Sequence, residues 1–280
     1  MATEPTPLPA PRTIVEMCFD SAGRADLGLV YGVADALGVA NQPVRLAIRR
    51  LESAGEATQH GRGRGGVLER TGSNPFPDPV AAGRLRRARG LADGTVTWDG
   101  NWRLTSFSFP DERRADRDAL RAALTRLGCV LLAPGLYLST TDPRAPLSHY
   151  APPAVRRLVG ELIVAEVTKL DVAGVSDPAA LVARLWSFAE AGDAYAIADA
   201  AVRADAGPHS DIGRIEHAAR ALRLAEPFAR ALALDPLLPP ELVPARWSTR
   251  AIHARFSVAW DRYVETGGDL ELYRQFKREV

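Results

Sequence analysis

The hydrophobic and polar positions between residues 41 and 51 predict an amphipathic helix. Val44, Ile48 and Leu51 follow one another at spacings of four and three, so they share one helical face that we expect to be core. Pro43 is tolerated only in the first turn, and Asn41 is a suitable N-cap, so the helix should start near residue 42. The opposite face carries four side chains that would point outward: Gln42, Arg45, Leu46 and Arg49.

Two short strands are predicted directly after this helix. Residues 56–60 and 67–70 flank a segment rich in Gly and Arg, whose glycines permit a tight turn, with Arg62 and Arg64 at its tip. The segment contains GxGxG, but it leads into a strand and no GK[ST] follows, which argues against a nucleotide-binding loop. A helix followed by such a hairpin is the order of elements found in a winged helix-turn-helix. Apolar positions in 13–20 and 30–37 predict two earlier helices beneath it.

The outward face of the predicted helix has the chemistry to read the major groove of DNA. Arginine reads guanine, glutamine reads adenine, and an apolar side chain contacts the thymine methyl group. We therefore expect the four outward side chains to contact bases, and three further arginines to bind the DNA backbone: Arg50, Arg62 and Arg64. Two alternatives stay open at this point, a small domain whose arginines are merely solvated and a winged helix that binds protein or RNA.

The distribution of charge favours nucleic acid. Residues 41–90 hold ten arginines and four acidic residues, a net charge of +6, whereas the whole chain carries only +1. A local concentration of positive charge is typical of a nucleic-acid footprint.

The rest of the chain divides by composition. Residues 1–11 contain four prolines and predict a disordered tail, which leaves 12–72 for the winged helix. Prolines and glycines followed by four arginines predict a basic linker over 73–93, containing one short helix.

A second domain is predicted over 94–172. Its expected elements are a strand, a helix begun by Asp111 and ended by Gly128, a hairpin around Pro134-Gly135, a second helix and a last strand, over 101–109, 111–127, 129–139, 152–159 and 162–168. The order βαββαβ is ferredoxin-like. Residues 173–280 are Ala/Leu-rich and mainly helical in pattern, are interrupted by prolines between 237 and 244, and end in a helix over 250–264. The predicted fold class is therefore α+β.

Length and composition narrow the class of protein. A chain of 280 residues suits two or three domains. No run of about 18 apolar residues and no signal-peptide pattern occur, so we expect a cytoplasmic protein with no membrane partner. Cys18 and Cys129 lie far apart and predict small buried side chains in a reducing compartment.

The sequence contains no strong motif for catalytic or metal-binding residues. The five histidines lack HExxH or other ligand spacing, and no GxSxG occurs. Acidic residues and arginines alternate between 111 and 121, as on a solvated helix face with i,i+4 pairs. Trp98 and Trp102 could stack on a ligand or on nucleic acid, but we favour packing in the core or at a domain interface. We therefore expect no enzymatic activity, no metal and no resident cofactor.

Several strings in the same order resemble one family. The winged-helix pattern is followed by Trp98-Asp99-Gly100-Asn101-Trp102-Arg103-Leu104, Pro110-Asp111-Glu112-Arg113-Arg114, Leu127-Gly128, and Asp235-Pro236-Leu237-Leu238-Pro239-Pro240-Glu241-Leu242-Val243-Pro244 with Trp247. This order resembles the PaaX family, repressors of phenylacetate degradation. The resemblance implies a homodimeric bacterial repressor with a winged helix, a ferredoxin-like middle domain and a helical C-terminal domain. Its effector would be an aryl-CoA thioester such as phenylacetyl-CoA, whose binding releases the operator.

Departures from the family leave the operator and the effector site open. Pro43 and the less polar outer face of the helix suggest a different operator, and residues 189–215 match no effector-binding region. We expect the effector in a cleft between domains, bordered by the middle domain. The middle domain of the family is similar to CRISPR adaptation nucleases, which carry an Asp near the end of the first strand. Here residues 105–109 hold no carboxylate before Asp111, which disfavours a divergent metal-dependent nuclease.

The sequence therefore predicts a DNA-binding regulator, a repressor of a catabolic operon released by an aryl-CoA-like effector. Its partners would be double-stranded operator DNA, a second copy of the chain and a small-molecule effector. Two recognition helices about 34 Å apart would match a palindromic operator. The alternative is a winged-helix regulator that acts through protein partners or without a CoA effector.

Overall fold

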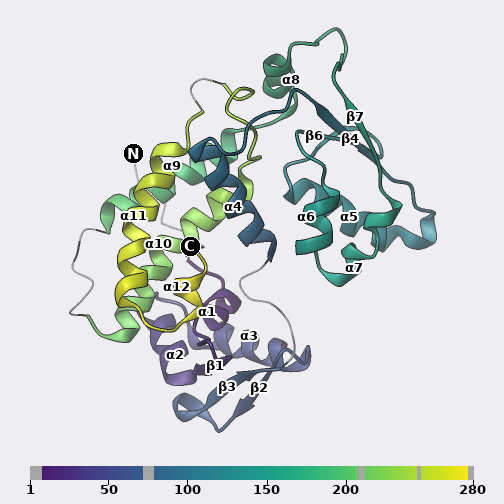
Figure 1. Ribbon diagram of the computed structural model, residues 1–280. Coiled ribbons are helices and arrows are strands. Elements are labelled where there is room, and N and C mark those ends of the chain that lie inside the picture. The colour runs from purple at the N-terminus through teal and green to yellow at the C-terminus, as the bar shows by residue number, and fades with distance from the viewer. Residues whose placement is uncertain (1–7, 72–78, 206, 208–211, 245–246, 277–280) are drawn as a thin grey trace. The chain divides into compact units, whose positions relative to one another are not determined.

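The structure, a computed structural model, describes residues 8–71, 79–205, 207, 212–244 and 247–276 (Figure 1). The chain forms two compact units. The first joins Met1–Pro77 with Ala194–Arg230 and Ala254–Val280, and the second joins Asp78–Asp193 with Ala231–His253. Of the four boundaries between them, one follows Pro77 and three fall inside helices: α9 (Ala189–Ala204), α10 (Arg214–Leu234) and α11 (Arg250–Thr266).

The N-terminal part of the first unit is a winged helix-turn-helix, as predicted. Three helices contact one another, α1 (Pro11–Met17), α2 (Leu27–Ala36) and α3 (Asn41–Ser53). An antiparallel sheet of order β1-β3-β2 follows, made of β1 (Arg24–Asp26), β2 (Ala57–His60) and β3 (Val67–Arg70), with a 3-10 turn, η1 (Gly63–Gly65), in the hairpin. Strand β1 was not predicted, because three residues are too short to show an alternating pattern.

Local sequence explains where two of these helices begin and end. Asp26 accepts a hydrogen bond from the backbone N–H of Leu29 at 2.9 Å and so caps α2. Gly38, with φ of 76°, makes the turn to α3. The expected N-cap of α3 is wrong: Ala40 occupies that position with no side-chain cap, and Asn41 is already helical. Among the described residues the buried Oδ1 of Asn41 has no hydrogen-bond partner.

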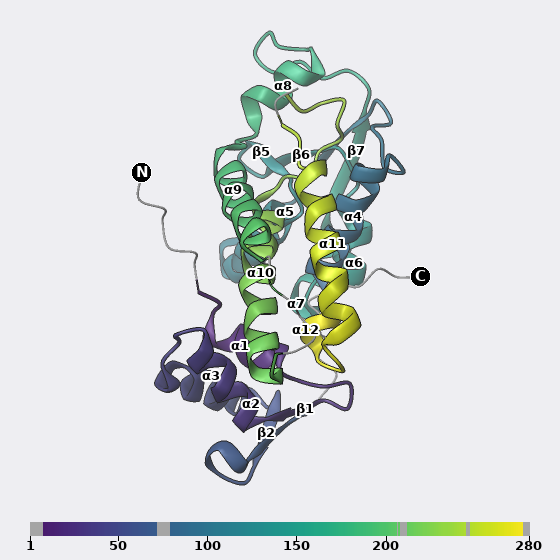
Figure 2. The same ribbon diagram turned by 90° about the vertical axis from the view of Figure 1, so that its left-hand side faces the viewer.

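Most of α9, α10 and α11 belongs to the same unit as the winged helix. Helices α10 and α11 lie side by side (Figures 1 and 2). The core between them is aromatic, with the rings of Phe228 and Phe256 stacked 3.7 Å apart and Trp260 packed on Phe256. The last short helix, α12 (Glu271–Arg274), contacts α1, and the Glu271 N–H donates to the carbonyl of Phe19 at 2.7 Å. The winged helix is thus tied to the end of the chain, an association that its own sequence does not predict.

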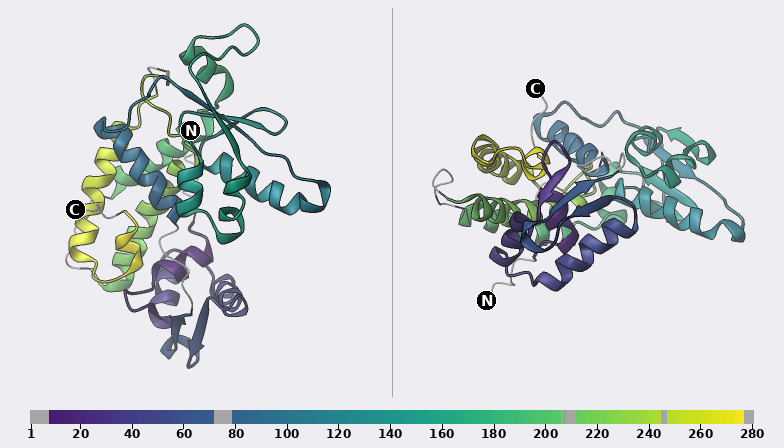
Figure 3. Two further views of the ribbon diagram at one scale, coloured as in Figure 1. Left: turned by 45° about the vertical axis from the view of Figure 1, so that its right-hand side comes forward. Right: turned by 90° about the horizontal axis from the view of Figure 1, so that it is seen from below.

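The second unit contains the predicted ferredoxin-like βαββαβ arrangement. Four antiparallel strands, β4 (Trp102–Ser106), β5 (Val130–Ala133), β6 (Leu136–Ser139) and β7 (Ile163–Val167), take the order β5-β6-β4-β7. A short 3-10 turn, η2 (Asp111–Arg113), and helix α5 (Arg114–Arg126) lead from β4 to β5. Helices α6 (Arg144–Tyr150) and α7 (Pro153–Arg156) and the turn η3 (Val159–Glu161) lead from β6 to β7 (Figure 3). In the register, Leu104 of β4 lies opposite Leu138 of β6.

Alternation along the strands divides the core of this unit into two clusters. Tyr137 packs with Phe107, Leu120 and Leu124 in the cluster that includes α5. Its neighbour Leu138 joins a second cluster with Trp102 and the buried residues of α8 (Pro178–Leu185). Trp102 is 1% exposed and its ring is stacked on that of Trp186, with centroids 6.3 Å apart, so it is a core residue, as we favoured.

The expected linker over 73–93 is helical over most of its length. Residues 72–78 lie outside the described part of the chain, and Pro79–Asp93 form α4. Arg84 is 8% exposed and donates to the carbonyls of Leu232 and Asp235, near the end of α10, and of Arg126, at the end of α5. An arginine there caps two helix C-termini.

This position of α4 changes the expected charge footprint. The four α4 arginines in the window 41–90 belong to the second unit, not to the winged helix. Residues 41–71 retain six arginines against three glutamates, a net charge of +3. The winged helix is still basic, but half of the excess that we assigned to it lies elsewhere.

The expected N-terminal tail lies mostly outside the described residues, which begin at Leu8. Helix α1 starts at Pro11, inside the range expected for the tail, because proline suits the first position of a helix. The predicted C-terminal helix over 250–264 is present as α11.

Candidate nucleic-acid interface

Helix α3 presents the four predicted base-contacting side chains on one exposed face. Its other face buries Val44, Ala47, Ile48 and Leu51 against the winged-helix core. Because that burial fixes the rotation of the helix, four side chains lie exposed on the remaining surface: Gln42, Arg45, Leu46 and Arg49. Leu46 is 42% exposed although it is apolar. This face therefore combines charged, amide and aliphatic groups, the three chemistries that read base edges.

The arginines of this face carry uncompensated charge. Within the described part of the chain, no carboxylate forms an ion pair with Arg45, Arg49, Arg50 or Arg62, and all four side chains are exposed. The nearby Glu52 instead accepts a hydrogen bond from the backbone N–H of Gln59 at 3.2 Å. The guanidinium groups are thus available to phosphates or bases.

The hairpin after α3 is a compact wing. Strands β2 and β3 pair with His60 opposite Val67, and the turn begins at Gly61, whose φ is 77°. A Cβ atom at Gly66 would lie 3.0 Å from both the carbonyl oxygen of His60 and Cδ1 of Leu27, so a larger residue there would force the loop away from α2. Arg62 is exposed, at the start of this turn and not at the tip where it was predicted.

Arg64, the second arginine expected at the wing tip, is engaged within the protein. Its Nη2 lies 2.5 Å from Oδ2 of Asp35 in α2, with the two side chains 57% and 46% exposed. Asp35 is 29 residues away in sequence, which is why the local pattern did not reveal this ion pair. An exposed pair of this kind is worth about 0–1 kcal/mol, so a phosphate could displace the carboxylate.

Other acidic groups around the wing are paired with basic ones. Glu69 of β3 lies 3.6 Å from Arg24 and 3.2 Å from the ring of His60. Glu56 lies 2.6 Å from Arg12. These pairs offset the negative charges of the wing, and they identify Arg12 and Arg24 as basic residues of this region that the sequence pattern did not single out.

The carboxylate that follows β4 in the middle domain lies at the surface. Asp111, the first carboxylate after β4, is 98% exposed and lies 3.5 Å from Arg117. Nowhere in the described ranges do three or more His, Cys, Asp or Glu side chains gather as a metal site would require.

The histidines with described surroundings lie in structural positions or at the surface. The ring of His217 is buried, with the hydroxyl oxygens of Tyr273 and Thr266 at 2.6 and 2.9 Å from its nitrogens. Burial, with a smaller contribution from Arg89, lowers the pKa of His253 to about 4. His209 lies outside the described residues.

Both cysteines are buried, as expected, at 2% and 6% exposure. Burial raises the pKa of Cys18 and of Cys129 to about 12, so both are thiols at neutral pH. Among the helices of the described residues, none combines the length and the apolar character needed to cross a membrane.

Comparisons with known proteins add one family match. Residues 95–162 match the model of the PaaX protein central Cas2-like domain. No curated protein matches the chain. A solved structure titled "Uncharacterized protein Rv0674 from Mycobacterium tuberculosis" is similar, with 18% identity over 93% of this chain and 99% of that chain and a TM-score of 0.49. The expected resemblance is thus confirmed for the ferredoxin-like domain, which matches the PaaX central Cas2-like domain model.

Proposed function

We propose that this chain is a transcriptional regulator that binds double-stranded operator DNA through α3 and the wing. The observation that carries the proposal is the exposed face of α3, where Arg45, Arg49 and Gln42 surround Leu46 and no acidic partner neutralises the arginines among the described residues. The PaaX domain over residues 95–162 supports a regulatory role, because the family acts in transcription.

The proposed contacts divide between bases and phosphates. Gln42, Arg45, Leu46 and Arg49 enter the major groove and discriminate bases. Arg50 and Arg62 bind phosphates and fix the position of the helix, and Arg64 joins them once a phosphate replaces Asp35. On this account, sequence preference depends on α3, whereas the wing mainly adds affinity.

The proposed active form is a homodimer in the cytoplasm. Two copies of α3 about 34 Å apart would read two half-sites one turn of DNA apart, so a palindromic operator is expected. The resemblance to PaaX proteins implies the same oligomeric state.

The proposed action is repression relieved by an aryl-CoA-like effector. Such a ligand can release DNA only if it binds the DNA-competent and DNA-incompetent forms of the dimer with different affinities. The effector class is carried over from the family resemblance, and no residue is assigned to it.

Fluorescence anisotropy with the DNA upstream of its own gene tests this function, at several salt concentrations and with or without phenylacetyl-CoA. Specific binding that the thioester abolishes supports both the regulator and its effector class. Specific binding that the thioester leaves unchanged supports the regulator and rejects this effector. An absence of binding at low salt would reject the DNA proposal and favour a regulator that works through protein partners, whose affinity would lack a steep dependence on salt.

A further inference from the structure

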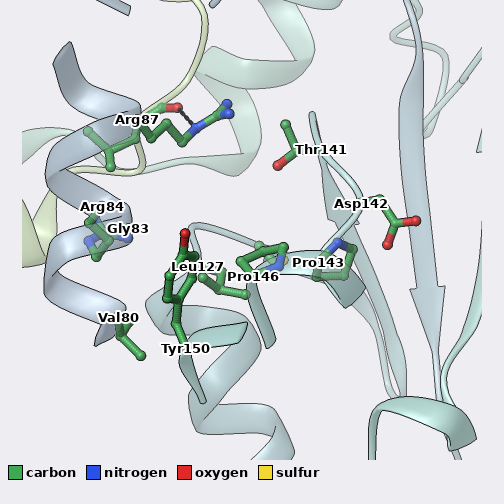
Figure 4. A pocket seen from close by; sticks show the side chains of 12 residues that line it. Val80, Gly83, Arg84, Arg87, Leu127, Thr141, Asp142, Pro143, Pro146 and Tyr150 are labelled. Carbon is green, nitrogen blue, oxygen red and sulfur yellow. Dashed lines mark hydrogen bonds between the residues drawn. The ribbon is translucent and has the colours of Figure 1, made fainter. Parts of the chain in front are cut away.

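We propose that the second unit binds a small organic anion, a carboxylate with a compact apolar body, in a cavity between α4 and α6. The cavity has a volume of about 250 Å³, and all the residues that line it belong to this unit (Figure 4). They come from α4, the end of α5, the loop after β6, α6 and the segment that follows α10.

The walls of the cavity are mainly apolar. Val80, Leu127, Pro143, Pro146 and Leu237 line it. The ring of Tyr150 lies against α4 at Gly83, where a Cβ atom would come within 3.0 Å of two ring carbons. A glycine at this position of the helix therefore leaves room for the aromatic wall. Such walls suit the hydrocarbon part of a ligand.

Arg87 supplies a positive charge at one end of the cavity. Its Nε donates to the carbonyl of Leu237 at 2.9 Å and one Nη donates to the hydroxyl of Thr140 at 3.3 Å, while the other Nη has no partner among the described residues. Figure 4 shows the guanidinium directed across the cavity towards Thr141. Burial lowers the pKa of Arg87, because the charged guanidinium loses part of its hydration there.

The carboxylates close to the cavity do not occupy this position. Asp142 lines the cavity, but its carboxylate is hydrogen-bonded to Arg144 and lies on the far side of Pro143 in Figure 4. Asp235 attracts Arg87 electrostatically, and its carboxylate also accepts the N–H of Leu237 at 2.8 Å. Two arginines, Arg84 and Arg87, line the cavity near this single carboxylate. A bound anion would therefore offset an excess of buried positive charge.

Two hydroxyl groups also line the cavity. Thr141 is exposed at its mouth, opposite Arg87. The hydroxyl of Tyr150 accepts a hydrogen bond from Arg86, so its own proton can be donated to a carboxylate oxygen. One guanidinium and two hydroxyls match the acceptor sites of a carboxylate.

The backbone at Leu237 shows that this site is built around an unusual conformation. Its φ is 52°, in the left-handed region that side chains larger than glycine rarely adopt. The bonds from its N–H to Asp235 and from Arg87 to its carbonyl hold it there. This conformation presents the carbonyl that orients Arg87.

The size of the cavity limits the ligand. A volume of about 250 Å³ lies just below the range of roughly 300–1,000 Å³ that is usual for drug-sized ligands. It suits a single ring with an acid group and is too small to enclose a nucleotide.

Isothermal titration of the full chain with benzoate, and with benzamide as a neutral molecule of the same shape, tests the site. We expect benzoate to bind at least tenfold more tightly than benzamide, a difference of about 1.4 kcal/mol. Arg87→Gln should remove this preference. The matched control is Arg121→Gln, which removes an exposed arginine of α5 that lines a different hollow and should leave benzoate binding unchanged.

A second variant keeps the test valid if Arg87→Gln fails to fold. Thr141→Ile changes an exposed residue and places a larger apolar side chain at the mouth, so it should weaken benzoate binding at least tenfold without loss of structure by circular dichroism. Equal binding of benzoate and benzamide, no benzoate binding up to about 10 mM, or loss of binding in Arg121→Gln alone would overturn the proposal. The titration needs no DNA, so its failure would leave the proposed regulator untouched.

Discussion

Single arginines in this protein have different roles that their surroundings determine. Arg84 is buried and donates to the last carbonyls of two helices. Arg64 is exposed but paired with Asp35. Arg45 and Arg62 are exposed and have no ion-pair partner among the described residues, which is the state that suits contact with DNA. Sequence alone shows how many arginines there are, but not which of them are available.

Replacement of single arginines should separate base reading from phosphate binding. Arg45→Ala should cost about 1–3 kcal/mol on the preferred DNA site and relax sequence preference, because a base-edge contact is lost. Arg62→Ala should weaken binding to all sequences evenly and reduce the salt slope by about one. Anisotropy on specific and scrambled duplexes measures both effects. A mutant series in which the two variants behave alike would refute the division of contacts.

Removal of Asp35 should strengthen DNA binding. Asp35→Asn frees the guanidinium of Arg64 at the wing, so we expect several-fold tighter binding at low salt and a salt slope steeper by about one. Stability should change by at most about 1 kcal/mol, because the pair is exposed. Asp111→Asn is the matched control, since it removes an exposed carboxylate in the second unit. An equal gain in both variants would indicate a general charge effect and contradict a role for Arg64.

His253 should make the protein less stable in acid. Its pKa is about 4 in the folded chain, below the ordinary histidine value of 6.5, so below pH 6.5 the unfolded state takes up a proton that the folded state does not. The free energy of unfolding should therefore fall between pH 6.5 and about 4, by up to about 3 kcal/mol. Urea unfolding across this range measures it. His253→Gln should flatten the pH dependence of the free energy of unfolding, whereas His149→Gln, at an exposed position, should leave it unchanged. Identical curves for His253→Gln and wild type would contradict the assignment.

At the scale of elements, regular periodicity made the prediction possible. Helix α3, the β2–β3 hairpin, helix α5 and the β5–β6 hairpin lie where apolar spacing and turn glycines place them. The helix expected over 152–159 is present but shorter, as α7, and an additional helix, α6, precedes it. The two are separated by Ala151 and Pro152, because a residue before proline is disfavoured in a helix. Long-range pairing also escaped prediction, since β1 exists only through its bonds to β3.

The sequence predicted part of the candidate DNA-binding site, as it predicted part of the fold. The rotation of α3 follows from which residues are apolar, so its exposed face could be identified from the sequence. The pairing of Arg64 with Asp35 and the placement of the α4 arginines depend on tertiary contacts, so no local pattern contained them. The cavity beside Arg87 joins segments more than a hundred residues apart in sequence.

Helix α4 should stabilise the second unit through Arg84. Arg84→Ala leaves carbonyls at the ends of α5 and α10 without their donor, so we expect a loss of about 3 kcal/mol. Four of the five tryptophans, Trp98, Trp102, Trp186 and Trp247, lie in this unit, so their fluorescence during urea unfolding reports on it. Arg114→Ala, at a side chain that is 78% exposed, should change stability by less than about 0.5 kcal/mol. Equal effects of the two substitutions would contradict a capping role.

At the scale of the whole molecule, the two units divide the proposed tasks. The first contains the winged helix together with most of α9, α10 and α11, and the second contains the region that matches the PaaX central domain and the proposed anion cavity. The chain passes between the units four times, and three of these passages lie within helices. A ligand held in the second unit could therefore influence DNA binding if it changed the equilibrium between two forms of the molecule.

The most direct test of the account is whether the exposed face of α3 reads sequence. Duplexes enriched from a random pool by the full chain would be compared with scrambled duplexes by anisotropy, for the wild type and for Arg45→Ala/Arg49→Ala. The account predicts that the wild type prefers the enriched sequence by about 10³-fold or more and that the double variant loses most of this preference while keeping its binding to scrambled DNA. An undiminished preference in the double variant, or no enrichment at all by the wild type, would contradict it.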